Sequence, residues 1–170
     1  MADAKAGIVA WARYFTGQVP HFQYTQGANR MQDIGQWPLQ YPITTDCSGF
    51  VTLCYYLAGA ADPNGQSYNH TGYTGTLLAH GKHINASLVQ PGDVVVYGPG
   101  TGEHTAIVVS VNKGDILTVS HGGPTGQSPI YCWVNPPRST PAQHYPSDGR
   151  KPQTFLTFNT KVIRTPRTPS

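Results

Sequence analysis

Two long runs of β-branched residues, joined by a short turn, constrain the fold of this 170-residue chain more than any other feature. The runs span 104–111 and 115–121, and the turn between them contains Asn112, Lys113 and Gly114. Strand-forming runs that are separated by a short turn predict an antiparallel β-hairpin. The length of the chain suits one domain with one hydrophobic core.

The register of this hairpin decides whether two histidines meet. If the turn is Asn112-Lys113, His104 lies directly opposite His121, with the two Cβ atoms about 5 Å apart. If the turn is Lys113-Gly114, the two histidines are diagonal neighbours on one face. Only a slip by one residue would separate them. Both turns therefore predict that His104 and His121 share a face of the sheet.

Two helices are expected before the hairpin. Asp3 can cap the first, whose apolar residues recur at helical spacing until Gly17 ends the run. The second helix is the clearest element of the sequence. It begins at Asp46 or Cys47, presents one apolar face and stops at Gly59.

The remaining segments predict short elements and long loops. A short helix is expected at 76–80, and further strands are expected at 93–97, 130–134 and 155–163. Long loops are expected at 18–45 and 135–153. We expect the folded domain to span 1–163 and the tail 164–170 to begin a linker to a further C-terminal domain.

Composition excludes several classes of protein. The formal net charge is only +3 and the lysines and arginines do not cluster, which argues against nucleic-acid binding. No apolar run approaches the roughly 20 residues that cross a membrane. The N-terminus lacks the basic and apolar segments of a signal peptide. Three irregularly spaced cysteines do not form a disulfide framework.

Metal sites and cofactors are not expected. His80 and His83 are separated by a glycine and have no further ligand set nearby, which argues against zinc. The segment 62–65 lacks the spaced acids and the final Glu of a calcium loop. The prediction is therefore a chemistry that side chains perform without a metal.

A cysteine at the start of a helix can act as a nucleophile. Unpaired N–H groups and the positive end of the helix dipole favour the thiolate of Cys47, and the same amides can stabilise an oxyanion. A nearby imidazole can take the proton and return it to a leaving amine. Of His104 and His121, one can serve as this base and the other can orient it. Cys54 and Cys132 are interpreted as buried core residues.

Four segments together resemble the successive motifs of the NlpC/P60 papain-like peptidases. They are Asp-Cys-Ser-Gly-Phe-Val at 46–51, Pro-Gly-Asp-Val-Val-Val-Tyr at 91–97, His-Thr-Ala-Ile-Val at 104–108 and Val-Ser-His-Gly at 119–122. The likeness covers roughly residues 4–125. Segments 72–78 and 120–123 are similar in particular to peptidase modules of actinobacterial proteins and actinophage endolysins.

The resemblance implies an α+β papain-like NlpC/P60 fold, with the nucleophile helix packed on an antiparallel β-sheet. It implies Cys47 as the nucleophile, His104 as the base and His121 as the residue that orients the base. The interval between the two histidines is longer than in compact bacterial members of the family.

The resemblance also implies residues that bind substrate. A tyrosine upstream of the nucleophile shapes the site in the family, and Tyr24 is the candidate here, although the usual Tyr-x-Trp-Gly-Gly pattern is absent. Asp46 and Ser48 occupy positions that bind the free L-Ala amine of a stem peptide in some relatives. Asp46 can alternatively be only the N-cap of the helix, and Tyr24 an ordinary loop aromatic.

The activity that the resemblance implies is peptidoglycan hydrolysis, at an amide bond of the stem peptide or cross-link, through an acyl-enzyme. An N-acetylmuramoyl-L-alanine amidase with the same three residues is the alternative, because it also attacks an amide. Further alternatives are a non-catalytic wall-binding module and a phage structural module, against which the intact Cys-His-His set argues.

Partner and location follow from the same resemblance. Peptidoglycan is the expected partner, and a monomer is the default state. A phage lysin, made in the host cytoplasm without a signal peptide and acting on the wall after release, fits better than a secreted host enzyme. A host enzyme would act in the extracellular wall.

Overall fold

The computed structural model describes residues 2–17, 21–122, 128–135 and 152–169, and its main element is a six-stranded antiparallel sheet. The strand order is β3-β8-β4-β5-β6-β7. These strands are β3 (Lys82–Ile84), β4 (Val94–Tyr97), β5 (His104–Asn112), β6 (Asp115–Ser120), β7 (Ile130–Trp133) and β8 (Gln153–Thr157). A separate parallel pair consists of β1 (Phe22–Tyr24) and β2 (Ile43–Thr45). The helices are α1 (Lys5–Thr16), α2 (Cys47–Leu57), α3 (Thr74–His80) and the 3-10 helix η1 (Ala86–Leu88).

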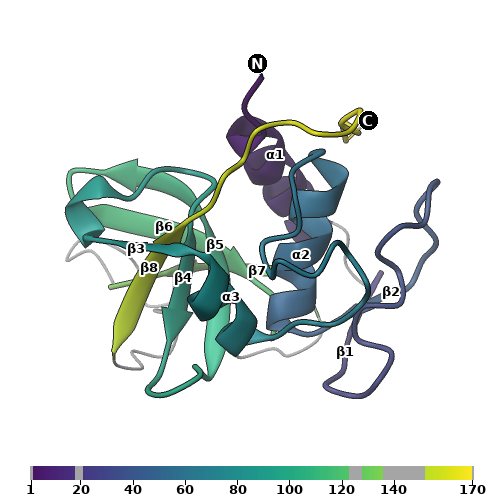
Figure 1. Cartoon of the computed structure of the whole chain (residues 1–170), viewed down its shortest axis with the longest axis horizontal. Helices are drawn as coiled ribbons and strands as arrows, with labels where there is room; N and C mark the ends of the chain where they lie inside the picture. The colour runs from purple at the N-terminus through teal and green to yellow at the C-terminus, as the bar shows by residue number, and fades with distance from the viewer. Residues whose placement is uncertain (1, 18–20, 123–127, 136–151, 170) are drawn as a thin grey trace.

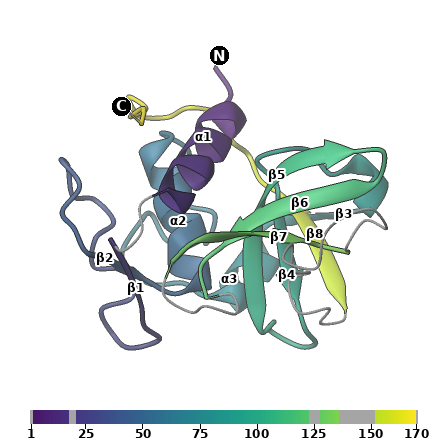
Figure 2. The same cartoon turned by 180° about the vertical axis from the view of Figure 1, so that it is seen from behind.

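Helices α1 and α2 lie side by side against the β5–β6 part of the sheet, as both views show (Figures 1 and 2). The pair β1–β2 lies beyond α2, away from the sheet (Figure 1). Helix α1 buries Ile8, Trp11, Ala12 and Phe15, the apolar face that the sequence predicts. This packing of two helices on an antiparallel sheet confirms the predicted α+β architecture.

The sheet buries apolar side chains on both faces. Val94 and Val96 pack in the cluster that contains α1 and α2, whereas Val95 and Tyr97 pack in a second cluster on the opposite face. This alternation follows from the two-residue period of a strand. A strand buried on both faces reads as a continuous apolar run, which explains Val-Val-Val-Tyr at β4.

Helix α2 begins and ends where local sequence rules place its ends. The Oδ1 atom of Asp46 accepts a hydrogen bond from the backbone N–H of Gly49 at 2.7 Å, so Asp46 is the N-cap. Gly59, with a φ of +84°, follows the last turn. The predicted limits of this helix are confirmed.

The hairpin has a different register from the one that the sequence predicts. Near the turn, Asn112 pairs with Asp115, as expected for a Lys113-Gly114 turn. The register then shifts between Val108 and Ser110, so that Ile107 pairs with Val119. A bulge of this kind inserts one residue into one strand and reverses the faces beyond it. Beyond the bulge, both registers that the sequence predicts are therefore wrong by one residue.

Several short elements also differ from prediction. The expected loop at 18–45 contains β1 and β2, and β3 falls in a segment without a predicted strand. Strand β8 ends at Thr157, earlier than expected, whereas α3 begins one half-turn earlier than the predicted 76–80. Three-residue strands are too short to show a period, and their partners come from distant segments. Most of the predicted loop at 135–153 lies outside the described residues.

The C-terminal segment lies across the body of the domain, next to α1 (Figure 1). The backbone N–H of Arg167 donates to the carbonyl of Leu57 at 2.7 Å, and the indole N–H of Trp11 donates to the carbonyl of Arg167 at 2.8 Å. The Arg164 guanidinium donates to the carbonyls of Tyr56 and Ala60. Residues up to Arg167 thus pack on the domain, and a linker in 164–170 stays a prediction.

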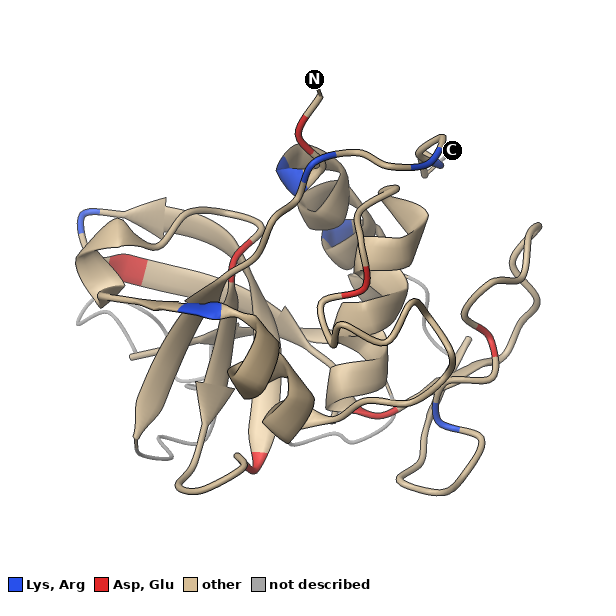
Figure 3. Cartoon of the chain, viewed as in Figure 1, with Lys and Arg blue, Asp and Glu red and all other residues tan. Residues whose placement is uncertain are grey.

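Charged residues are sparse and dispersed along the part of the chain that the structure describes, and the lysines and arginines do not cluster in the ribbon view (Figure 3). Among the described residues, the helices are all too short or too polar to cross a bilayer.

Candidate active site

The predicted nucleophile is the first residue of α2. Capping by Asp46 turns the chain into the helix at this point, so Cys47 lies among backbone N–H groups that have no partner within the helix. Its sulfur accepts a hydrogen bond from the backbone N–H of Thr105, near the start of β5. The side chain is only 6% exposed. The fold thus brings Cys47 to the residue that directly follows His104.

Burial controls the charge of this thiol. It raises the pKa of Cys47 to about 11 from an ordinary value of 9.0, and the Asp46 carboxylate adds to the rise. Backbone N–H groups oppose the rise, namely those of Thr105, Ser48 and Cys47 itself. The helix start therefore lowers the pKa as expected, but desolvation outweighs it. The net shift of the Cys47 pKa is therefore upward, opposite to the direction that the helix start alone predicts.

His104, the predicted base, begins β5. Its ring stacks on that of Tyr97, with centroids 6.0 Å apart and planes at 24°. The two residues are register partners in the β4–β5 pair, so they share a face. Tyr97 itself belongs to the second apolar cluster of the sheet. His104 is nearly buried, with 7% of its surface exposed.

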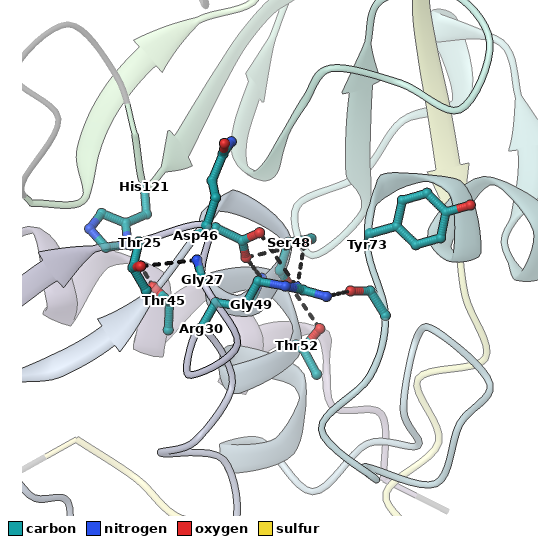
Figure 4. A network of polar contacts seen from close by, with 12 residues as sticks. Thr25, Gly27, Arg30, Thr45, Asp46, Ser48, Gly49, Thr52, Tyr73 and His121 are labelled. Atoms are coloured by element: carbon teal, nitrogen blue, oxygen red, sulfur yellow. Dashed lines mark hydrogen bonds and ion pairs between the residues drawn. The ribbon is translucent and has the colours of Figure 1, made fainter.

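His121 follows the end of β6 and lies on the helix side of the sheet. It is fully buried, and its ring is surrounded edge to face by the rings of Phe22, Tyr24 and Phe50 at 5.2 to 6.3 Å. Its Nδ1 atom is 2.6 Å from Oγ1 of Thr45 (Figure 4). Thr45 stands two residues before the nucleophile, so this hydrogen bond ties the end of β6 to the start of α2.

Tyr24, the tyrosine predicted to shape the substrate site, is one of the aromatic residues around His121. Its ring lies 5.2 Å from that of His121, and its hydroxyl accepts a hydrogen bond from the Gln26 side chain at 3.2 Å. Gly122 has a φ of +101°, and a Cβ atom there would lie 2.4 Å from the Tyr24 ring. The structure thus brings Tyr24 next to His121, while its role toward substrate stays a prediction.

Asp46 and Ser48 have an intramolecular partner that sequence reasoning missed. The Nη1 atom of Arg30 lies 3.4 Å from Oδ2 of Asp46 and 3.4 Å from Oγ of Ser48. The Nη2 atom of Arg30 donates to the carbonyl of Gly72 (Figure 4). Arg30 belongs to the segment that the sequence predicts only as a loop. No motif marks it, because its role depends on where that loop packs.

A close backbone approach fixes Arg30 in this position. A Cβ atom at Gly49 would lie 2.6 Å from the carbonyl oxygen of Arg30 and 3.0 Å from Oδ1 of Asp46. Met31 and Ile34 are buried in the helix-side cluster and anchor the same segment. The small residue at position 49 thus lets the Arg30 loop pack directly on the start of α2.

The remaining cysteines and the candidate metal ligands lie elsewhere. Cys54 and Cys132 are buried, as predicted, and burial raises the pKa of Cys54 well above its ordinary value. The Asp62 carboxylate accepts hydrogen bonds from backbone N–H groups of its own loop, including that of Tyr68. Within the described ranges, three or more His, Cys, Asp or Glu side chains nowhere form a group that could hold a metal ion.

Comparison with known proteins gives one family and one fold. The family described as CHAP domain matches residues 35–123, more than half of the chain, and this range contains Cys47, His104 and His121. No curated protein matches the sequence.

Solved structures similar to the chain share its whole architecture at low sequence identity. The NlpC/p60 domain of the peptidoglycan hydrolase SagA is 20% identical, with a TM-score of 0.51, over 91% of this chain and 98% of that one. The P60 domain of antigen MAP1204 from Mycobacterium avium subspecies paratuberculosis is 16% identical, with a TM-score of 0.50, over 92% and 98%. The peptidoglycan hydrolase RipB from Mycobacterium tuberculosis is 18% identical, with a TM-score of 0.50, over 92% and 66%. The chain therefore has the predicted papain-like NlpC/P60 fold.

Proposed function

We propose that this chain, which belongs to the CHAP domain family, is an enzyme of the cysteine peptidase and amidase type that hydrolyses an amide bond of bacterial peptidoglycan with Cys47 as nucleophile. One observation carries the proposal. The Cys47 sulfur lies at the first turn of α2, in a hydrogen bond with the residue that follows His104. The names of SagA and RipB as peptidoglycan hydrolases support the choice of substrate.

The raised pKa of Cys47 favours a first step in which the thiol loses its proton as it attacks. Because the pKa of Cys47 is about 11, its proton leaves as the sulfur attacks the carbonyl carbon of the amide. His104 takes this proton. The new S–C bond turns the carbonyl oxygen into an oxyanion, which the N–H groups at the start of α2 stabilise. The C–N bond then breaks, and His104 returns the proton to the leaving amine.

The second half of the reaction releases the acyl group. Water attacks the thioester carbonyl while His104 accepts a proton from it, and the C–S bond breaks as Cys47 regains a proton. The products are a carboxylic acid and a free amine, and the enzyme returns to its starting state. Every proton moves between substrate, water and side chains of this chain.

His121 is proposed as the third residue of the site, which orients the base His104, and Thr45 holds its ring in place. The imidazole lies in an apolar surround in which Thr45 Oγ1 bonds to Nδ1 at 2.6 Å. A hydrogen bond at one ring nitrogen sets the orientation of the ring and the chemistry of the other nitrogen. Thr45 is therefore a positioning residue for His121.

The endolysin role is a finer proposal. It rests on the likeness of segments 72–78 and 120–123 to peptidase modules of actinophage endolysins. A phage lysin of this kind should lyse intact actinobacterial walls from the outside when purified. Failure to lyse any such wall, combined with activity on purified fragments, would contradict this role and leave the hydrolase proposal standing.

Digestion of defined peptidoglycan fragments tests the function itself. Wild type should release fragments whose masses differ from the substrate by one added water per cut, and Cys47→Ala should release none while keeping its fold. The masses also distinguish a cut within the stem peptide or cross-link from a cut between the glycan and L-Ala. Equal digestion by Cys47→Ala and wild type would refute the mechanism.

A further inference from the structure

Arg30 places a positive charge beside the two residues that flank the nucleophile. Its Nη1 atom lies 3.4 Å from Oδ2 of Asp46 and 3.4 Å from Oγ of Ser48, and Figure 4 shows the guanidinium next to these two side chains. The Arg30 side chain is 21% exposed and that of Asp46 only 11%, so the ion pair is largely shielded from water. In such surroundings a charge pair interacts more strongly than on the open surface.

The Asp46 carboxylate is already committed to partners within the protein. Oδ1 accepts from the N–H of Gly49 at 2.7 Å and from the hydroxyl of Ser48 at 3.2 Å, and Oδ2 pairs with Arg30. A substrate ammonium at Asp46 would have to lie against the like charge of Arg30 or displace it. Displacement would also break the hydrogen bond of Arg30 to Gly72.

The Arg30 loop has little freedom to move aside. Met31 and Ile34 are 1% and 2% exposed in the helix-side core. The carbonyl of Arg30 approaches the start of α2 so closely that only glycine fits at position 49. A cation that the fold holds in place acts as a repulsive element against a second cation.

We propose that Arg30 supplies, from within the protein, the cation that pairs with Asp46 and Ser48, and thereby selects stem peptides whose amino terminus is acylated. A stem peptide that is still linked to the glycan strand has an uncharged amide at this position, whereas a released stem peptide has an ammonium group. Arg30 is then a specificity-determining residue against the released peptide. This inference rests on the proposed peptidoglycan hydrolase function.

Binding measurements in the Cys47→Ala background separate this inference from the catalytic one. The probes are two versions of one stem peptide, with a free or an acetylated amino terminus. The acetylated peptide should bind at least about tenfold more tightly, because it avoids the charge repulsion. Adding Arg30→Ala should reduce this ratio by about tenfold or reverse it, whereas Arg30→Lys should retain it.

Two further variants keep the test decisive. Arg30→Gln removes the charge but can still donate to Gly72, so it should lose the preference even if Arg30→Ala does not fold. Arg13→Ala serves as a matched control, because Arg13 bonds to Tyr131 and the carbonyl of Val109 and to neither residue beside Cys47. The inference would be overturned if Arg30→Gln left the ratio of the two peptide affinities unchanged. It would also be overturned if Cys47→Ala alone bound the peptide with the free amino terminus more tightly than the acetylated one. Loss of wall digestion by the wild type would instead count against the proposed function.

Discussion

The two ends of helix α2 are each held by an arginine, but the two arginines bond to different kinds of groups. At the C-terminal end, Arg164 donates to the carbonyls of Tyr56 and Ala60 and lies over the rings of Tyr56 and Tyr68, at 4.4 and 4.9 Å. At the N-terminal end, Arg30 pairs with the carboxylate and hydroxyl beside the thiol.

This difference separates stability from chemistry within one helix. The last carbonyls of a helix lack partners and carry partial negative charge, so a cation there stabilises the fold. The first N–H groups carry partial positive charge, and the cap by Asp46 uses only that of Gly49. Those of Cys47 and Ser48 lower the pKa of the thiol, and the proposed mechanism assigns them the oxyanion. Substitutions at the two ends should therefore have separable effects.

The largest expected effect is at the N-terminal end, on replacing the base. His104→Ala should reduce kcat/KM on peptidoglycan fragments by about 10²- to 10⁴-fold, because no group then takes the thiol proton. The melting temperature of the purified variant serves as the control for its fold. A loss of less than about tenfold in a folded variant would argue that another residue is the base.

The next effect concerns the hydroxyl that holds His121. Thr45→Val keeps the shape of the side chain but removes the hydrogen bond, and should lower kcat by on the order of 100-fold through misplacement of the ring. Thr45→Ser restores the hydroxyl and should recover most of the rate. The pH profile of kcat/KM should shift in the valine variant only. Equal rates for the two variants would show that Thr45 has a packing role alone.

A third effect is the pH dependence of the thiol. Because burial raises the pKa of Cys47 to about 11, alkylation by iodoacetamide should accelerate about tenfold per pH unit from pH 7 toward that value. Cys47→Ala provides the blank for Cys54 and Cys132. A rate that levels off below pH 8 would indicate a thiolate at neutral pH.

The same shift makes a prediction for stability. The folded pKa of Cys47 lies above its ordinary value of 9.0, so the folded state favours the protonated thiol. Its contribution to the free energy of unfolding is present below pH 9 and declines as the pH rises toward 11. Denaturant titrations at pH 7 and pH 10 give the free energy of unfolding at each pH. Its decrease between the two pH values should be smaller for Cys47→Ala than for the wild type.

The smallest expected effect is at the C-terminal end of α2. Arg164→Ala should lower the free energy of unfolding by about 2 kcal/mol, since it removes two hydrogen bonds and two contacts with aromatic rings. Its kcat on peptidoglycan fragments should remain that of the wild type at a temperature where both are folded. A selective loss of activity would break the separation of roles between the two ends.

Local sequence rules are enough to place the predicted nucleophile at the start of a capped helix. Asp46 as N-cap, Cys47 at the first turn and Gly59 at the stop all follow from neighbours in sequence, and the structure confirms them. The hairpin and its turn were also predictable, because β-branched runs need no distant partner to be recognised.

Non-local contacts decided what the sequence did not reveal. A single bulge between Val108 and Ser110 offsets the strands beyond it by one residue from the register that either simple turn predicted. Strands β1 and β2 form by pairing segments about 20 residues apart, which no periodicity indicates. Arg30 reaches the start of α2 because its loop packs on Gly49.

By itself, the sequence determined that a cysteine begins a capped helix and that a hairpin with two histidines follows it. These features depend on φ/ψ preferences and side-chain bonds within a few residues. Only the tertiary structure decided the burial that raises the pKa of the thiol, the aromatic rings around His121 and the cation beside Asp46. Each of these depends on desolvation or on contact between distant segments, which arise only when the whole chain packs.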